Sequence, residues 1–135
     1  MSDGDVRQRI ARLALVVTDY DRALAFYVGV LGFRCLEDTA YPEEDKRWVV
    51  VAPPGDGGAE LVLAQARDAR QRTRVGDQAG GRVFLFLETD DFERDHRRYR
   101  EAGVEFVREP KRFPYGTVAV FRDPFGNLWD LIEPA

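Results

Sequence analysis

The sequence predicts an α+β protein made of two βαβββ modules, a fold class that rests on two observations. The same order of elements (a strand, a helix and three strands) can be read twice along the chain. Two stretches of the first half also align without gaps on the second half: TDYDRA from Thr18 on DDFERD from Asp90, and VVVAPPGDGGAEL from Val49 on AVFRDPFGNLWDL from Ala119. This internal repeat identifies structurally equivalent positions.

The first half begins with a strand and a helix. The run IARLALVVT, residues 10–18, is rich in β-branched and aliphatic residues and ends at TDYD, a polar cluster that can cap a helix. Apolar residues then recur at helical spacing, and Gly32 supplies a C-terminal stop. The apolar stripe consists of Tyr20, Leu24, Tyr27 and Leu31. The runs FRCLED, KRWVVVAPP and AELVLAQ follow as strands, separated by polar residues or by Pro and Gly.

A polar segment, ARDARQRTRVGDQAGG at residues 66–81, separates the halves. We interpret it as a connector with solvated arginines and no regular element, the alternative being a lid over a ligand. After it, RVFLFLETDDFERDHRRYREAGVEFV reads as strand, capped helix and strand, and GTVAVFRDPFGNLWDLIE as two strands around a turn. We therefore expect one domain over residues 1–135, with modules at about 8–65 and about 82–135.

Composition narrows the classes of function. The chain has 135 residues, 44% of them hydrophobic, which is enough for one core. Its net charge is only −4 with interspersed signs, so we expect no nucleic-acid or membrane partner. The N-terminal MSDGDVRQR lacks the apolar core of a signal peptide, and no run is long enough to span a membrane. Cys35 stands alone, which excludes an internal disulfide, and we expect an unprocessed cytoplasmic protein.

The repeat also indicates where a site would lie. Alternate residues of a strand share one face, and a single helix covers only one face of each small sheet. Leu13 and Leu15, with Leu85 and Leu87 at an offset of 72 residues, are expected beneath the helices. The uncovered faces of the two modules would then enclose a cup. Around its axis we expect Arg12, Glu60, Phe84 and Asp130.

The motifs resemble the vicinal oxygen chelate superfamily, which groups glyoxalase I, bleomycin- and fosfomycin-resistance proteins and extradiol dioxygenases. The resemblance covers nearly the whole chain, through LALVVTDYDRALAFYVGVLGF, TDDFERD, AGVEF and DPFGNLWDLIE. It implies a cup of two βαβββ modules in a pseudo-twofold arrangement, usually completed in a homodimer. It also implies that metal-dependent members take ligands from the first and fourth strands of each module. Those positions are held here by Arg12, Glu60, Phe84 and Asp130.

This set departs from the metal pattern of the family, whose first-strand positions often hold His or Gln. Arg12 cannot be deprotonated to coordinate, and only Glu60 and Asp130 remain competent as ligands. We therefore expect no metal cofactor, the alternative being a divalent, oxygen-preferring ion at Glu60 and Asp130. The only histidine, His96, aligns with Leu24 on the helical stripe, so we expect it to pack rather than to bind a metal.

Arg12 has two interpretations of similar weight. Held by Glu60, Asp130 or both, it could present its guanidinium to a ligand oxygen, or it could form a purely structural ion pair. The other expected ligand-binding residues are aromatic or polar: Arg47, Trp48, Phe84, Phe86 and Tyr115. Tyr41 and the PEED segment are expected to form a mobile loop at the rim, and Cys35 to be an inert buried thiol in the second strand.

The leading functional prediction is a metal-independent protein of the bleomycin-resistance type that binds a small organic molecule in the cup. The alternative is a lyase or isomerase in which Glu60 or Asp130 acts as general base and Arg12 stabilises the developing oxyanion. A third possibility is a metalloenzyme with Mg or Mn at Glu60 and Asp130. A homodimer is expected in each case, from the resemblance and from the open edges of so short a chain.

Overall fold

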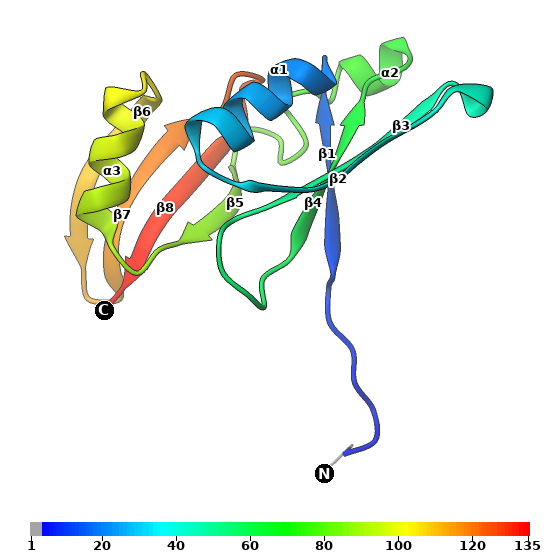
Figure 1. Cartoon of the computed structure of the whole chain (residues 1–135). Coiled ribbons are helices and arrows are strands. Elements are labelled where there is room, and N and C mark those ends of the chain that lie inside the picture. Colours follow the sequence, from blue (N-terminus) through cyan, green and yellow to red (C-terminus); the bar gives the residue numbers. More distant parts are fainter. Residues whose placement is uncertain (1–3) are drawn as a thin grey trace.

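The two predicted modules form two separate four-stranded sheets in the computed structural model, which describes residues 4–135 (Figure 1). The first three residues of the N-terminal segment discussed above lie outside this range. The first module contains β1 (Arg12–Val17), α1 (Tyr20–Leu24), η1 (Ala25–Val30), β2 (Arg34–Tyr41), η2 (Pro42–Glu44), β3 (Lys46–Ala52) and β4 (Glu60–Gln65). The linker contains α2 (Ala69–Arg72). The second module contains β5 (Val83–Glu88), α3 (Phe92–Glu101), β6 (Glu105–Phe113), β7 (Gly116–Arg122) and β8 (Leu128–Pro134).

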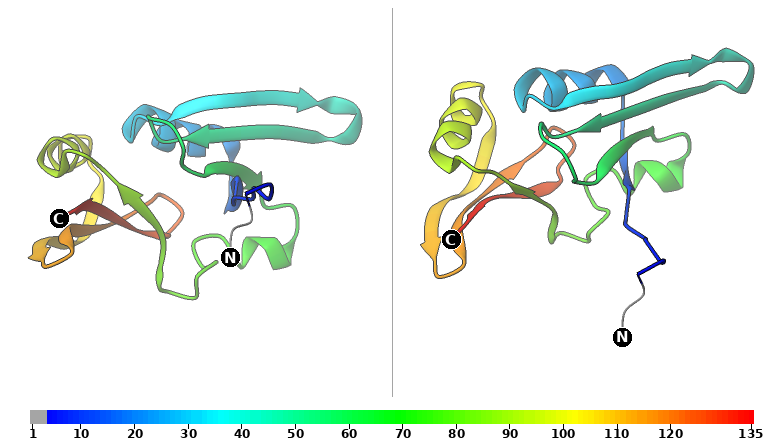
Figure 2. Two further views of the ribbon diagram at one scale, coloured as in Figure 1. Left: turned by 90° about the horizontal axis from the view of Figure 1, so that it is seen from below. Right: turned by 60° about the horizontal axis from the view of Figure 1, so that its bottom comes forward.

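Both sheets have the same topology, which confirms the predicted fold class. The strand orders are β1-β4-β3-β2 and β5-β8-β7-β6, and the first strand of each module pairs in parallel with its fourth. The helices of both modules lie on the same side of the molecule (Figures 1 and 2). No helix within residues 4–135 is long and apolar enough to cross a membrane.

The first helix changes its geometry halfway. Asp19 caps α1 by accepting a hydrogen bond from the Asp21 amide at 3.1 Å, as the TDYD cluster predicts. From Ala25 the helix continues as the π-helix η1, in which the Leu31 amide bonds to the Phe26 carbonyl at 2.9 Å. The adjacent Phe26 and Tyr27 are both buried there, so the apolar face is wider than the predicted stripe.

One hydrophobic core joins the two modules. Leu15 and Leu63 of the first sheet and Trp129 and Leu131 of the second belong to a single cluster of buried side chains. The Tyr27 ring on η1 lies 5.8 Å from the Trp129 ring, centroid to centroid. The helix of the first module therefore packs on residues of the second module.

The duplication is inexact in the sheets. The helix caps Asp19 and Asp91 are separated by 91 − 19 = 72 residues, but Glu60 and Asp130 by 130 − 60 = 70. The strand register differs as well: Arg12 pairs with Glu60, whereas Phe86 rather than Phe84 pairs with Asp130. A shift of two residues preserves which face a side chain occupies, so the predicted faces are retained although the expected partner of Asp130 is not.

The linker contains a short helix and is hydrogen-bonded to the first module. The prediction of a connector without regular structure is wrong at α2. Asp68 caps this helix, because its side chain accepts a hydrogen bond from the Gln71 amide at 2.7 Å. The Gln78 amide group accepts from the Val16 N–H at 2.8 Å and donates to the Ala14 carbonyl at 3.0 Å. The Gln78 side chain thereby satisfies two backbone groups of the edge strand β1 that a neighbouring strand would otherwise bind.

The β2–β3 hairpin projects from the body of the protein (Figures 1 and 2). Its tip contains the Tyr41 and PEED segment expected as a rim loop, of which Pro42–Glu44 form the short helix η2. The register pairs Tyr41 with Lys46 and Thr39 with Trp48. These side chains occupy the face of the first sheet that the helices leave open.

Candidate functional site

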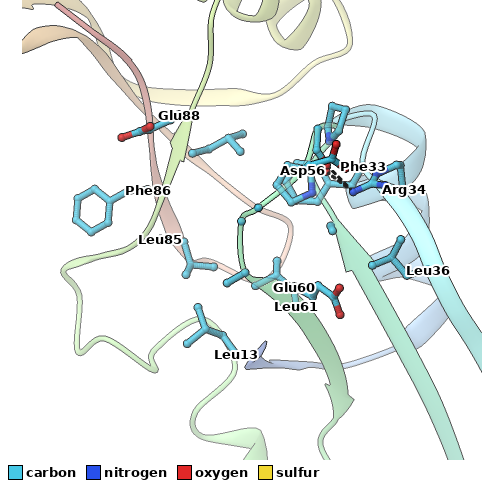
Figure 3. Close-up of a pocket in the computed structure, with 18 of the residues that line it drawn as sticks. Leu13, Phe33, Arg34, Leu36, Asp56, Glu60, Leu61, Leu85, Phe86 and Glu88 are labelled. Atoms are coloured by element: carbon cyan, nitrogen blue, oxygen red, sulfur yellow. Dashed lines mark hydrogen bonds between the residues drawn. The ribbon is translucent and has the colours of Figure 1, made fainter. Parts of the chain in front are cut away.

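A hollow of about 830 Å³ lies at the seam between the two modules (Figure 3). We call it the inter-module crevice. Exposure along β1 explains why it is open: Leu15 and Val17 are fully buried, whereas Leu13, at the end of the strand farther from the helix, is 37% exposed. The apolar wall of the crevice is formed by Leu13, Phe33, Leu61, Leu85, Leu87 and Trp129. Both modules therefore contribute apolar surface to one concave site.

Polar groups surround this wall. The Pro/Gly-rich loop of residues 53–59 forms one side, and Arg34 fixes it by donating hydrogen bonds to the carbonyls of Pro53 at 3.3 Å and Gly55 at 2.8 Å (Figure 3). Glu60 and Glu88 also line the crevice. The crevice thus combines an apolar wall with charged and hydrogen-bonding groups, an arrangement that suits an organic ligand with both apolar and polar parts.

Arg12 pairs with Glu60, one of its two predicted partners. The Arg12 Nε atom lies 3.1 Å from the Glu60 Oε1 atom, and their side chains are 53% and 28% exposed. An ion pair this exposed adds little to stability. Within residues 4–135, no ion pair joins Arg12 to Asp130, which lies in the other sheet.

Asp130 instead shares its sheet with Arg108. The strand registers align Phe86, Asp130, Val120 and Arg108 in one row across the second sheet, so all four lie on the same face. Asp130 is half-buried, and its burial raises the pKa of the carboxyl group while the charge of Arg108 acts in the opposite direction. The sequence did not reveal Arg108, because two register shifts in β6 interrupt the alternation around it.

The other predicted ligand-binding residues are dispersed. Arg47 lies on the helix side of its sheet, bound to Asp38 at 2.8 Å and to Asp21 at 3.0 Å, and its guanidinium is engaged within the protein. Phe84 sits at a register shift in β5 and packs against the core. Of the three other aromatic residues, Trp48 on the hairpin is half-buried, whereas Phe86 beside Asp130 and Tyr115, stacked on Phe113 at 5.1 Å, are exposed. Of these, only Phe86 lines the crevice.

The structure adds a residue that the sequence reasoning missed. Asp123 is 3% exposed and accepts hydrogen bonds from the hydroxyl of Tyr27, the backbone amides of Phe125 and Asn127, the Asn127 side chain and the indole of Trp129. Burial, and then the charge of Asp123, raise the pKa of Tyr27 well above its ordinary value. Asp123 therefore fixes a wall of the crevice, Trp129, to the helix of the first module.

Two further side chains were predicted to be inert. His96 packs as expected, with its ring 5.5 Å from Phe92 and 4.5 Å from Phe106, centroid to centroid. The prediction for Cys35 is wrong in part: the residue lies in β2 as expected, but its side chain is exposed. A register shift between Cys35 and Glu37, on an edge strand, accompanies this exposure.

His96 gives a pH-dependent prediction. Its Nε2 atom is buried without a hydrogen-bond partner among residues 4–135, and desolvation, with a smaller contribution from Arg100, lowers its pKa, although Glu109 raises it. The unfolded chain therefore binds a proton at higher pH than the folded protein. As the pH falls below about 6.5, the ordinary histidine pKa, the free energy of unfolding should therefore decrease. The contribution of His96 to this decrease ends once the pH is below its pKa in the folded protein.

Urea denaturation between pH 7.5 and 5 of the wild type and of His96→Phe measures this effect. The Phe variant keeps the ring stacking and removes the titration, so it should lose less stability on acidification. Equal losses in the two proteins would contradict the interpretation.

The family-type metal positions do not form a suitable donor set. Glu60 is paired with Arg12, and the residue that pairs with Asp130 on the first strand of its module is Phe86, which has no donor atom. In the part of the chain that the structure describes, no three His, Cys, Asp or Glu side chains are grouped so that they could hold a metal ion. Transition-metal sites require more donors than these positions offer.

Comparisons with known proteins agree on one family. The chain matches the model of the "Glyoxalase/Bleomycin resistance protein/Dioxygenase superfamily" over residues 9–131. It is 56% identical over 128 residues to an uncharacterised protein of Shewanella frigidimarina (strain NCIMB 400), covering 95% of each chain. The crystal structure of UcmS2 is similar with a TM-score of 0.81 and 32% identity, covering 94% of this chain and 98% of that one. The structure of TnmS3, an antibiotic binding protein from Streptomyces sp. CB03234, gives a TM-score of 0.76 and 32% identity, covering 96% and 98%.

Proposed function

Because the chain belongs to the glyoxalase/bleomycin resistance protein/dioxygenase superfamily, we propose that it binds a small organic molecule with an apolar or flat ring system in the inter-module crevice. The main observation in support is the crevice itself, whose volume of about 830 Å³ falls in the range typical of small-molecule sites. The likeness to TnmS3, described as an antibiotic binding protein, supports this proposal. The proposal includes no metal, because the residues that pair with Glu60 and Asp130 on the first strands are Arg12 and Phe86, and neither side chain can coordinate a metal ion.

The polar groups would orient the ligand. Glu60 and Glu88 offer acceptors at the edge of the apolar wall, and Arg12 neutralises part of the charge of Glu60. Leu13, Leu85 and Trp129 would contact the ring system from both modules. We expect the protein to act as a cytoplasmic homodimer. Native mass spectrometry of freshly purified protein would report subunit number, retained ligand and metal together.

A charge placed in the crevice should abolish binding. Leu13→Glu introduces a carboxylate into the apolar wall at a position 37% exposed, so the fold should tolerate it. The flat, apolar dye Nile red serves as the probe, and its fluorescence on titration with protein gives the affinity. We expect the variant to bind at least about tenfold more weakly, since burying an unpaired charge beside the dye costs more than about 1.4 kcal/mol.

Val6→Glu is the matched control. Val6 is apolar and 63% exposed, and it is not among the residues that line the crevice. This variant should bind Nile red like the wild type. If Leu13→Glu also bound like the wild type, the crevice would not be the binding site.

A second candidate function is a metal-independent lyase or isomerase, favoured by one observation. Asp130 is a half-buried carboxyl group with a raised pKa on an open face, a feature typical of general bases. Arg108, in the same row of the sheet, would stabilise the developing negative charge in place of Arg12. Turnover that survives chelators and disappears in Asp130→Asn would support catalysis.

A further inference from the structure

The projecting hairpin carries a hollow of its own. It has a volume of about 220 Å³ and is lined by Glu37, Tyr41, Glu44, Lys46 and Trp48. We call it the hairpin hollow. The register explains how these residues meet, since Tyr41 pairs with Lys46 and Thr39 with Trp48, while Glu37 lies two residues before Thr39 on the same face. None of these residues lines the inter-module crevice.

A cation already lies over the aromatic wall of the hairpin hollow. The Lys46 ammonium is 5.9 Å from the centroid of the Trp48 ring, within the range of a cation–π interaction. The face of the indole ring is electron-rich, so it attracts positive charge without coordinating it. The Lys46 ammonium therefore shows the kind of group, an organic cation, that the Trp48 ring attracts.

Two carboxylates are available beside the same wall. Glu44 lies in η2 and Glu37 in β2, and both line the hollow. Among residues 4–135, neither forms an ion pair, and the carboxylate of Glu37 accepts one hydrogen bond, from the Thr39 hydroxyl at 3.2 Å. An aromatic face flanked by negative charge is the arrangement by which proteins recognise organic cations.

We propose that the hairpin hollow binds an organic cation, a protonated amine or a quaternary ammonium group, with its charge over Trp48 and beside Glu37 and Glu44. The incoming group takes the place of the Lys46 ammonium, which swings out to solvent on its flexible stem. This site goes beyond the proposed function, because it can be occupied whether or not the crevice holds a ligand.

Choline titration tests the proposal. In 15N-labelled protein, the indole N–H signal of Trp48 should shift and that of Trp129 should remain in place. The neutral isostere 3,3-dimethylbutan-1-ol, which has the shape of choline without its charge, should bind at least about threefold more weakly, given the modest energy of an exposed cation–π contact. Lys46→Met removes the competing cation and should tighten choline binding by about threefold or more.

Three variants identify the recognition groups. Trp48→Leu and the double variant Glu37→Gln/Glu44→Gln should each weaken choline binding by about tenfold, whereas Trp48→Phe keeps an aromatic face and should retain most of it. All should bind Nile red like the wild type, so a failure here is distinct from a failure at the crevice. Equal affinity for choline and its neutral isostere, wild-type affinity in the Glu double variant, or no shift at Trp48 would each overturn the proposal.

Discussion

Replacing Asp123 with alanine is expected to lower the free energy of unfolding by at least about 3 kcal/mol, because buried donors lose their acceptor at a cost of about 1–3 kcal/mol each. The carboxylate is 3% exposed and accepts from Tyr27, Asn127 and Trp129 side chains as well as from two backbone amides. Without it the turn at residues 123–127 loses its anchor and the two modules lose a polar contact.

Asp130→Ala is the matched control for Asp123→Ala. Asp130 lies seven residues further along the chain and is half-buried, and desolvation disfavours its charged form. Its removal should change stability by less than about 1 kcal/mol. Urea denaturation at pH 7 measures both variants. Similar effects at the two positions would show that Asp123 does not anchor the turn.

Gly76→Ala is expected to produce the second large effect. Gly76 has a φ of 72°, and a Cβ atom there would overlap the backbone carbonyl oxygen of Phe125. The linker lies so close to the turn of the second module at this point that one backbone must move. We expect a loss of about 3 kcal/mol or more, combining the left-handed conformation with overpacking.

Gly80→Ala separates these two contributions. Gly80 lies in the same linker with a φ of 64°, but an added Cβ atom would meet nothing within 4 Å. Its replacement should cost only about 1–2 kcal/mol, the price of the left-handed conformation alone. Thermal unfolding of both variants gives the comparison. If Gly76→Ala were no more destabilising than Gly80→Ala, the linker would not be packed tightly against the turn.

The fold was predictable because its signals are local. Helix caps such as Asp19 and Asp91 act on amides two or three residues away, and strand alternation is visible within a few residues. The π-helical half of the first helix was not predictable in the same way. It accompanies the burial of the adjacent Phe26 and Tyr27 against a core to which the second module contributes Trp129, a contact about which the local pattern carries no information.

The candidate site was less predictable, because it depends on strand register. The sequence identified Glu60 and Asp130 as equivalent carboxylates, and Arg12 does pair with Glu60. It could not show that β5 is displaced by two residues along β8, which brings Phe86 to Asp130. Nor could it show the contact between Tyr27 and Asp123, which are 96 residues apart in the sequence. The apolar crevice arises from how the two modules pack, which the pattern of either module alone does not specify.

We expect Gln78 to oppose self-association through β1. An edge strand presents unpaired amides and carbonyls that can template the addition of a strand from another molecule, and the resulting polymers grow into aggregates. The Gln78 side chain occupies the Val16 amide and the Ala14 carbonyl, so one glutamine blocks the middle of this edge. We therefore expect the linker that joins the modules also to oppose fibre formation through this edge.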